Sequence, residues 1–173
     1  MRSLEPGHSR RHAGVTTALV LILCMPIAVA PSNVNAQDRT VPASEQQSFD
    51  NHIAEASHRF GIPQPWIRAV MEVESAGNPR AVSHAGAMGL MQIMPGTWAE
   101  LRAAHRLGDD PFDPRDNILA GAAYLRQMYD RFGSPGFLAA YNAGPARYQN
   151  HLDTGRALPL ETRNYLAILA PLI

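Results

Sequence analysis

Apolar residues recur at helical spacing along this chain, and glycine or proline separates each such stretch from the next. The stretches carry helix start and stop signals, such as Asp113-Pro114 before an apolar stripe and Gly133 after it. The expected helices run from a cap at Ser44 to Gly61, from Pro63 to Gly77, from a cap at Thr97 through Leu101, from Asp113 to Gly133, from Ser134 to Gly144, and around Tyr165 to Leu169. No segment alternates as a strand does, and 78–89 offers the only place for a small hairpin. We therefore expect one compact, mostly α domain.

The first residues have the pattern of an export signal. Arginines precede an apolar run at 15–30, which is short for a membrane span, and Val34-Asn35-Ala36 offers a small-residue cleavage site. We expect residues 1–36 to be a signal peptide, with cleavage after Ala30 and an uncleaved anchor as alternatives. The mature protein would then be periplasmic.

Beyond the leader we expect a linker at 37–47 and a folded domain at 48–173. The only cysteine, Cys24, lies in the leader, so the mature chain has no disulfide and no thiol nucleophile. Removal of three arginines and one glutamate leaves a formal charge of about minus two, and no basic run remains. These properties argue against nucleic-acid binding, and no later segment has the pattern of a membrane span.

Glu74 is the most informative acidic residue. It continues the apolar stripe of Ile67, Val70 and Met71 at a helix end, whereas Glu72 points away and has Arg68 one turn earlier as an ion-pair partner. A carboxyl group among apolar side chains tends to keep its proton, as a general acid must. The alternative is a helix-terminal glutamate that reaches water, and the spacing does not decide between them.

The segment from Asn78 to Pro95 follows Glu74 directly. Its small residues allow close approach of backbone or ligand, and Ser83 and Gln92 are its outward polar groups. An amide side chain both donates and accepts, which suits an amino sugar. On chemistry alone, a tight turn in which the backbone satisfies Gln92 is the preferred reading.

Four blocks of sequence together resemble one family. They are Glu74-Ser75 with Ser83, then Gly86-Ala87-Met88-Gly89-Leu90-Met91-Gln92-Ile93-Met94-Pro95, then Ala140-Tyr141-Asn142-Ala143-Gly144, and finally Glu161-Thr162 with Tyr165. In this order they resemble the soluble lytic transglycosylases, which have a lysozyme-like fold related to goose-type lysozymes. The resemblance spans about 49–173 and makes residues 48–173 the expected catalytic domain. The small size resembles members that accompany secretion or conjugation machines.

The resemblance implies a site and a reaction. The enzymes of this family cut the bond between N-acetylmuramic acid and N-acetylglucosamine in peptidoglycan without water and leave 1,6-anhydro ends. No metal or cofactor is expected, and the partners would be glycan strands and a secretion or conjugation apparatus. The implied residues are Glu74 as the single catalytic carboxylate and Ser83, Gln92, Met94, Tyr141, Asn142, Glu161 and Tyr165 as substrate-binding residues.

A second catalytic carboxylate is hard to find in the sequence near Glu74. The aspartates between Asp109 and Asp116 are better explained as charges at a helix start. A single acid that first donates and then takes back a proton fits this shortage, with the substrate's own acetamido oxygen shielding C1. We also expect the hydroxyl of Tyr141 within hydrogen-bond range of Glu74 or of the bound acetamido group. A hydrolase on the same fold and an inactive binding protein are the alternatives.

The histidines and tryptophans of the sequence do not predict a further binding site. The histidines show no metal-ligand spacing, and we expect them to be solvated or at the edge of the core. Trp66 and Trp98 could stack on sugars, but tryptophans at helix starts are more often part of the core.

Overall fold

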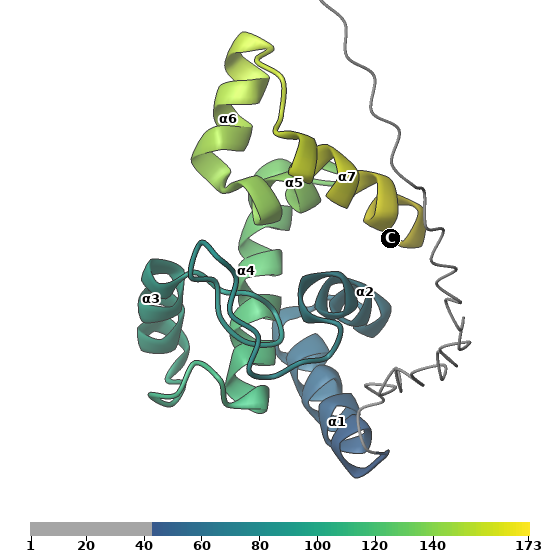
Figure 1. Cartoon of the computed structure of the whole chain (residues 1–173), viewed down its shortest axis with the longest axis vertical. Coiled ribbons are helices and arrows are strands. Elements are labelled where there is room, and N and C mark those ends of the chain that lie inside the picture. The colour runs from purple at the N-terminus through teal and green to yellow at the C-terminus, as the bar shows by residue number, and fades with distance from the viewer. Residues whose placement is uncertain (1–42) are drawn as a thin grey trace, which may run out of the picture. The chain divides into compact units, whose positions relative to one another are not determined.

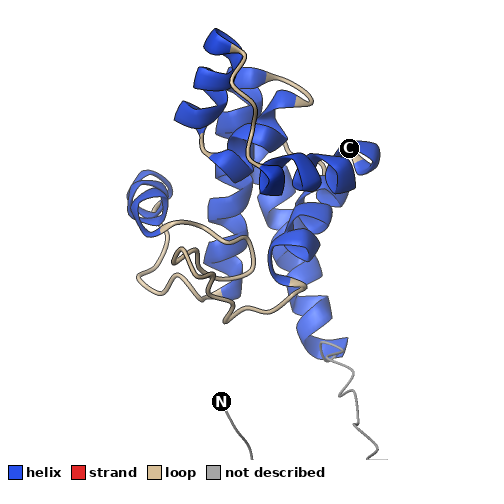
Figure 2. Ribbon diagram, turned by 45° about the horizontal axis from the view of Figure 1, so that its top comes forward, coloured by secondary structure: helices blue, strands red, loops and turns tan. Residues whose placement is uncertain are grey.

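The computed structural model describes residues 43–173, and within them the chain forms seven α-helices, one short 3₁₀ helix and no strand (Figures 1 and 2). The predicted signal peptide with Cys24 lies outside the described residues. The elements are α1 (Ala43–Phe60), α2 (Gln64–Ser75), α3 (Pro95–His105), α4 (Pro114–Phe132), α5 (Gly136–Ala143), α6 (Pro145–Thr154), α7 (Leu160–Leu169) and η1 (Ala170–Leu172). The mostly α class is confirmed. No helix between residues 43 and 173 has both the length and the apolar character needed to cross a membrane.

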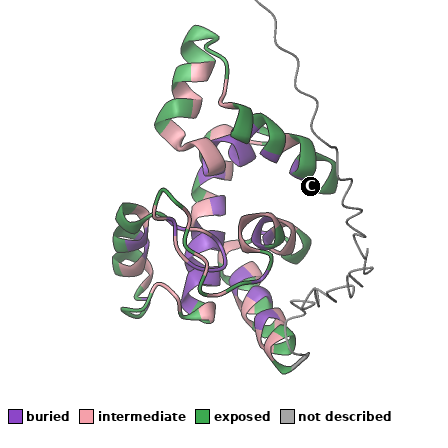
Figure 3. Cartoon of the chain, in the orientation of Figure 1, coloured by how far each residue is buried: buried purple, intermediate pink, exposed green. Residues whose placement is uncertain are grey.

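Helix α4 forms the centre of the domain. Its residues from Asp116 to Ala123 are all buried, and it packs against α1, α2, α3 and α5 (Figure 3). The Asp113 side chain caps its start by accepting a hydrogen bond from the backbone N–H of Asp116 at 2.9 Å. The predicted start and stop of this helix are therefore confirmed.

Some helix boundaries differ from the prediction. Helix α3 begins at Pro95 after Met94, so Thr97 lies inside the helix and does not cap it. Proline supplies this start because its fixed φ suits the first helical position. Helix α1 begins at Ala43, within the segment 37–47 that was predicted as a linker, and Ser44 is therefore helical and not a cap.

Helix α6 was not predicted from the sequence. It has no buried residue, so it lacks the apolar stripe on which the other helices were recognised. Its two ends do carry a signal, because Pro145 follows Gly144 at the start and Gly155 ends it in the left-handed conformation at φ 70°.

Trp98 is part of the core, and the half-buried Trp66 packs against it. The Trp66 ring stacks on Phe137 at 5.3 Å between centroids and also contacts Tyr129 at 5.8 Å, which ties α2 to α4 and α5. Trp98 is only 6 % exposed and packs in the same core from α3.

The long connection between α2 and α3 has no regular strand. The hairpin considered for 78–89 is reduced to two isolated bridges, Val82 with Met88 and Met88 with Ile93. Asn117 of α4, which is fully buried, holds this connection in place. Its Oδ1 accepts from the Met91 N–H at 2.7 Å, and its Nδ2 donates to the carbonyls of Met88 at 3.1 Å and Pro111 at 2.8 Å.

Close approach of the connection to α4 requires glycine at two positions. A Cβ on Gly89, whose φ is +74°, would lie 2.5 Å from Asn117 Nδ2, and a Cβ on Gly121 would lie 2.5 Å from the Met91 side chain. The glycines thus let the connection lie directly on the helix, with Asn117 filling the contact.

We expect Asn117→Ala to lower the free energy of unfolding by about 3 kcal/mol, because three backbone groups, one of them fully buried at Met91, lose their partner. Chemical denaturation followed by circular dichroism measures this. The control is Asn78→Ala, an exposed asparagine that accepts one local hydrogen bond from Arg80, which should cost less than about 1 kcal/mol. Equal losses in the two variants would contradict the anchoring role of Asn117.

Candidate active site

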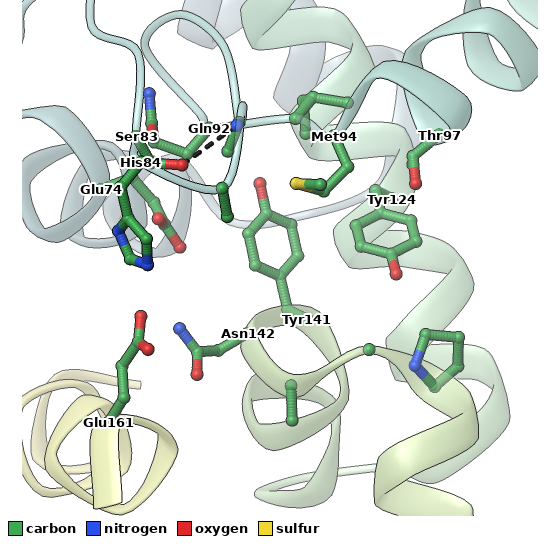
Figure 4. Close-up of a pocket in the computed structure, with 16 residues that line it drawn as sticks. Glu74, Ser83, His84, Gln92, Met94, Thr97, Tyr124, Tyr141, Asn142 and Glu161 are labelled. Carbon is green, nitrogen blue, oxygen red and sulfur yellow. Dashed lines mark hydrogen bonds between the residues drawn. The ribbon is translucent and has the colours of Figure 1, made fainter. Parts of the chain in front are cut away.

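A cleft of about 480 Å³ lies between two walls of the domain. One wall is the end of α2 with the connection and the start of α3, and the other is the end of α5, the start of α6 and the start of α7 (Figure 4). Seven of the eight predicted site residues line it: Glu74, Ser83, Gln92, Met94, Tyr141, Asn142 and Glu161. Tyr165 is the exception. The structure therefore brings the separate sequence blocks together at one place, while the roles of these residues stay predictions.

Glu74 is the last residue but one of α2. Ile67, Val70 and Met71 on the same stripe are buried, as the spacing predicted. The helix ends there because Ala76 adopts the left-handed conformation at φ 49° and its N–H bonds the Glu72 carbonyl. Glu74 therefore extends from a rigid helix end toward the cleft.

The expected ion pair between Glu72 and Arg68 is wrong. Glu72 is exposed, as predicted, but within residues 43–173 Arg68 pairs with Asp50 of α1. This pair ties α2 to α1, which an i, i+4 partner on the same helix could not do.

Burial raises the pKa of Glu74 from 4.5 to about 7. Loss of hydration is the largest cause, because the charged carboxylate is penalised more than the neutral acid. The hydroxyl of Tyr165 opposes this and lowers the pKa, and the charge of Glu161 adds a smaller increase. At neutral pH a large fraction of the Glu74 side chains therefore holds a proton, as a general acid requires.

Tyr165 stands behind this carboxyl group. Its ring is buried, and its hydroxyl faces Glu74 closely enough to lower the pKa without reaching normal hydrogen-bond geometry. It is the only fully buried side-chain polar atom without a partner among the described residues. Because an unpaired buried hydroxyl is costly, we interpret Tyr165 as a donor held ready for Glu74 when that group ionises.

Tyr141 does not bind Glu74. Its hydroxyl donates to the backbone carbonyl of Met91 at 2.8 Å, so Glu74, one of the two expected partners, does not receive this hydrogen bond. The contact joins α5 to the connection and fixes the ring in the cleft wall. Contact with the bound acetamido group, the other expected partner, stays a prediction. Tyr124 of α4 lies against the Tyr141 ring at 5.2 Å and lines the same wall.

The connection is built by its own polar side chains. Ser83 Oγ accepts from the Ala87 N–H at 3.0 Å, and Gln92 Nε2 donates to the carbonyls of Ala81 at 3.2 Å and Gly89 at 2.9 Å. The backbone thus satisfies the amide nitrogen of Gln92, as expected from the interpretation of this segment as a tight turn. Two carbonyl partners fix the orientation of the amide, and within residues 43–173 its Oε1 receives no hydrogen bond. This oxygen is free to accept from a ligand.

Glu161 is a second carboxylate in the cleft. It lies exposed in the first turn of α7, and Figure 4 shows its side chain pointing toward Glu74 from the opposite wall. The sequence near Glu74 gave no sign of a carboxylate opposite it, because Glu74 and Glu161 are far apart in the chain. The resemblance had placed Glu161 in the site but gave no reason to expect it opposite the acid.

Further cleft residues were missed. They are His84, Ala85, Ala87, Ile93, Thr97, Tyr124, Ala143, Gly144 and Pro145. His84 had been grouped with the solvated histidines, and it is exposed, but it projects between Glu74 and Glu161 (Figure 4). The sequence did hold one signal that His84 lies in the cleft, namely its position next to Ser83. Among the described residues no group of three or more histidine, cysteine, aspartate or glutamate side chains could hold a metal ion.

Comparison with known proteins identifies related chains. The family described as the transglycosylase SLT domain matches residues 51–162. The transglycosylase of Enterobacteria phage PRD1 is 41 % identical over 93 residues, which cover 53 % of this chain and 33 % of that protein. The soluble lytic murein transglycosylase of Escherichia coli K12 is 42 % identical over 123 residues, covering 61 % of this chain and 19 % of that protein. The chain thus spans a third or less of the length of these relatives.

Solved structures show the same fold. The complex of the 70-kDa soluble lytic transglycosylase with bulgecin A superposes with a TM-score of 0.63 at 32 % identity, over 72 % of this chain and 23 % of that one. An inactive glutamate-to-glutamine mutant of the lytic transglycosylase Slt from Pseudomonas aeruginosa gives a TM-score of 0.62 at 33 % identity, over 69 % and 22 % of the two chains.

Glu74→Gln should stabilise the protein at alkaline pH. A raised pKa means that the folded state binds the proton more tightly than the unfolded state between pH 4.5 and about 7, so stability falls as pH rises through this window. The amide has no charge to bury. We expect its advantage over the parent protein to be about 2–3 kcal/mol larger at pH 8 than at pH 4, by urea denaturation. A pH-independent difference would contradict the raised pKa.

Proposed function

The chain belongs to the transglycosylase SLT domain family, and on this premise we propose that it is a peptidoglycan lytic transglycosylase. The proposed reaction cuts the β-1,4 bond between N-acetylmuramic acid and N-acetylglucosamine without water and leaves a 1,6-anhydro ring. The observation that carries the proposal is the desolvated Glu74 in the cleft, with its pKa near 7. The inactive glutamate-to-glutamine mutant of the Pseudomonas aeruginosa relative supports a glutamate-dependent reaction.

In the first step Glu74 donates its proton to the glycosidic oxygen. The bond from C1 to this oxygen breaks, and N-acetylglucosamine leaves with a new 4-hydroxyl group. Positive charge develops at C1, where the substrate's own acetamido oxygen shields it as in substrate-assisted glycosidases. The protein contributes the proton and the position, so no metal or cofactor is part of the step.

In the second step Glu74 takes the proton back. The muramoyl 6-hydroxyl attacks C1, and its proton passes to the carboxylate, so that the enzyme returns to its starting state. A carboxylate with a pKa near 7 is a stronger base than an exposed glutamate, and the hydroxyl of Tyr165 stabilises it while it is charged. The internal nucleophile is already in place, which gives it an entropic advantage over water.

The remaining cleft residues are proposed to hold the sugars. Gln92 offers its Oε1 and Asn142 its amide to hydroxyl and acetamido groups, and Met94, 44 % exposed, offers an apolar face. Ser83 shapes the connection that carries them. The proposed substrate lies in the cell envelope, which agrees with the export signal and the periplasmic location predicted for residues 1–36. Recruitment by a secretion or conjugation apparatus stays a prediction.

A second candidate function is hydrolysis on the same fold. It is favoured by Glu161, because a carboxylate opposite the acid could activate water as in inverting glycosidases. Glu161 is exposed at the cleft wall, whereas Glu74 is desolvated, so the two groups are not equivalent. The two functions differ in product, since hydrolysis adds one water.

The first experiment is digestion of purified peptidoglycan followed by mass spectrometry of the fragments. We expect muramoyl ends lighter by one water than hydrolytic ends, and kcat/KM that falls as pH rises through about 7, because the protonated acid is lost. Glu74→Gln should lower turnover by at least about a hundredfold. Glu72→Gln, on the exposed face of the same helix, is the matched control and should keep activity. Hydrated ends from the parent protein would refute the lyase assignment.

Glu161→Gln separates binding from base catalysis. Removal of this charge lowers the pKa of Glu74, so we expect the alkaline limb of the pH profile to move to lower pH. At the pH optimum the anhydro product should persist, with kcat within about tenfold of the parent value. Glu161→Asp keeps the charge, so the alkaline limb of its pH profile should stay close to that of the parent protein. Complete loss of turnover in Glu161→Gln with unchanged binding would favour the hydrolase.

A further inference from the structure

A second cavity of about 570 Å³ lies between α6 and the connection from α6 to α7. Arg147, Asn150 and Arg156 line it with Ala146 and 157–159. We call it the arginine cavity. No acidic residue lines it, so its two guanidinium groups give it a positive field.

The two arginines of this cavity have no carboxylate partner within the described part of the chain. Five other arginines there pair with carboxylates, for example Arg68 with Asp50 and Arg102 with Asp109, whereas Arg59, Arg106, Arg131 and Arg163 are also without such a pair but do not line the cavity. Among residues 43–173 the side chains of Arg147 and Arg156 form no salt bridge. The nearest acid in sequence, Asp153, accepts a hydrogen bond from Gln149 at 2.9 Å. Two unpaired forks facing one cavity form a suitable site for a carboxylate.

The backbone around Arg156 is fixed to α6. The Arg156 carbonyl accepts from His151 Nδ1 at 2.7 Å, its N–H donates to Thr154 Oγ1 at 3.3 Å, and that hydroxyl donates to the Asn150 carbonyl at 2.7 Å. Gly155 allows the tight reversal. The backbone that carries Arg156 is therefore held in place before a ligand arrives, while the side chains of Arg147, Asn150 and Arg156 are exposed and accessible to one.

The arginine cavity continues from the cleft along the same elements. Gly144 and Pro145 line the cleft, and the next residues, Ala146 and Arg147, line the arginine cavity. On the other side, Glu161 lines the cleft and Pro159 the cavity. The arginine cavity therefore adjoins the cleft on both segments, α6 and the approach to α7.

We propose that the arginine cavity binds a carboxylate of the peptide stem carried by the glycan strand in the cleft. The proposal rests on the proposed function, because the lactyl group of N-acetylmuramic acid carries the stem in peptidoglycan. Arg147 and Arg156 hold the carboxylate by their forks, and Asn150 donates its amide to the same group or to a peptide carbonyl. The site selects strands that still carry peptides.

The binding test uses a free stem tetrapeptide with the Glu74→Gln protein, so that turnover plays no part. We expect chemical-shift changes in 146–159 by nuclear magnetic resonance and about tenfold weaker binding to the additional Arg147→Gln/Arg156→Gln variant. The matched control is Arg106→Gln/Arg131→Gln, which removes the same charge from exposed arginines that line neither cavity. Equal binding by both variants, or equal binding of a carboxyl-amidated peptide, overturns the proposal. Inorganic phosphate binding tighter than the peptide also overturns it.

The kinetic test compares peptide-bearing strands with strands stripped of peptide by an amidase. The Arg147→Gln/Arg156→Gln variant should raise KM about tenfold on peptide-bearing strands, with kcat unchanged and no effect on stripped strands. An equal change on both substrates overturns the proposal. Failure of the proposed function gives a different result, because the parent protein would then release anhydro product from neither substrate.

Discussion

The placement of a buried helix, α4, beneath the long connection is the constraint on which the rest of the molecule depends. The connection consists of turns and two isolated bridges and forms no continuous ladder, so its position on the domain depends on what lies under it. Asn117 satisfies two of its backbone groups, at Met88 and Met91, and a third at Pro111 in the loop before α4, and Gly121 leaves the space into which Met91 packs. Because the same segment carries Ser83 and Gln92, the cleft wall is positioned by the core.

Burial together with two residues of α7 sets the protonation state of the acid. Glu74 loses hydration at a helix end while Tyr165 and Glu161 act on it in opposite directions. The result is a carboxyl group that is close to half ionised at neutral pH, at which donating and accepting a proton are both accessible. This arrangement lowers the stability of the fold, because it buries an acid next to the unpaired hydroxyl of Tyr165.

Much of the fold follows from local signals in the sequence. The stripe around Ile67, the Asp113 cap and the glycine stops predict α2, α4 and their ends because each depends on neighbours in the chain. Helix α6 was missed because it buries no residue and its evidence lay only at its ends. The sequence also pointed to Glu74, since its position on an apolar stripe is a local property. Contacts such as Tyr141 with Met91, and Glu161 opposite Glu74, depend on how distant segments meet, and spacing alone holds no information about that.

The unequal burial of Glu74 and Glu161 bears on how one acid would serve both steps of the proposed reaction. Two carboxylates that divide the work need environments that hold one protonated and the other ionised. Here Glu74 is desolvated and has a pKa near 7, and Tyr165 is placed to stabilise its charge, so its surroundings suit both the protonated and the ionised form. The charge of Glu161 raises the proton affinity of Glu74 from across the cleft. That influence strengthens Glu74 both as the group that keeps a proton until sugar binds and as the base that recovers it. The second carboxylate is thus compatible with a single-acid mechanism, in which it tunes the acid and contacts the strand.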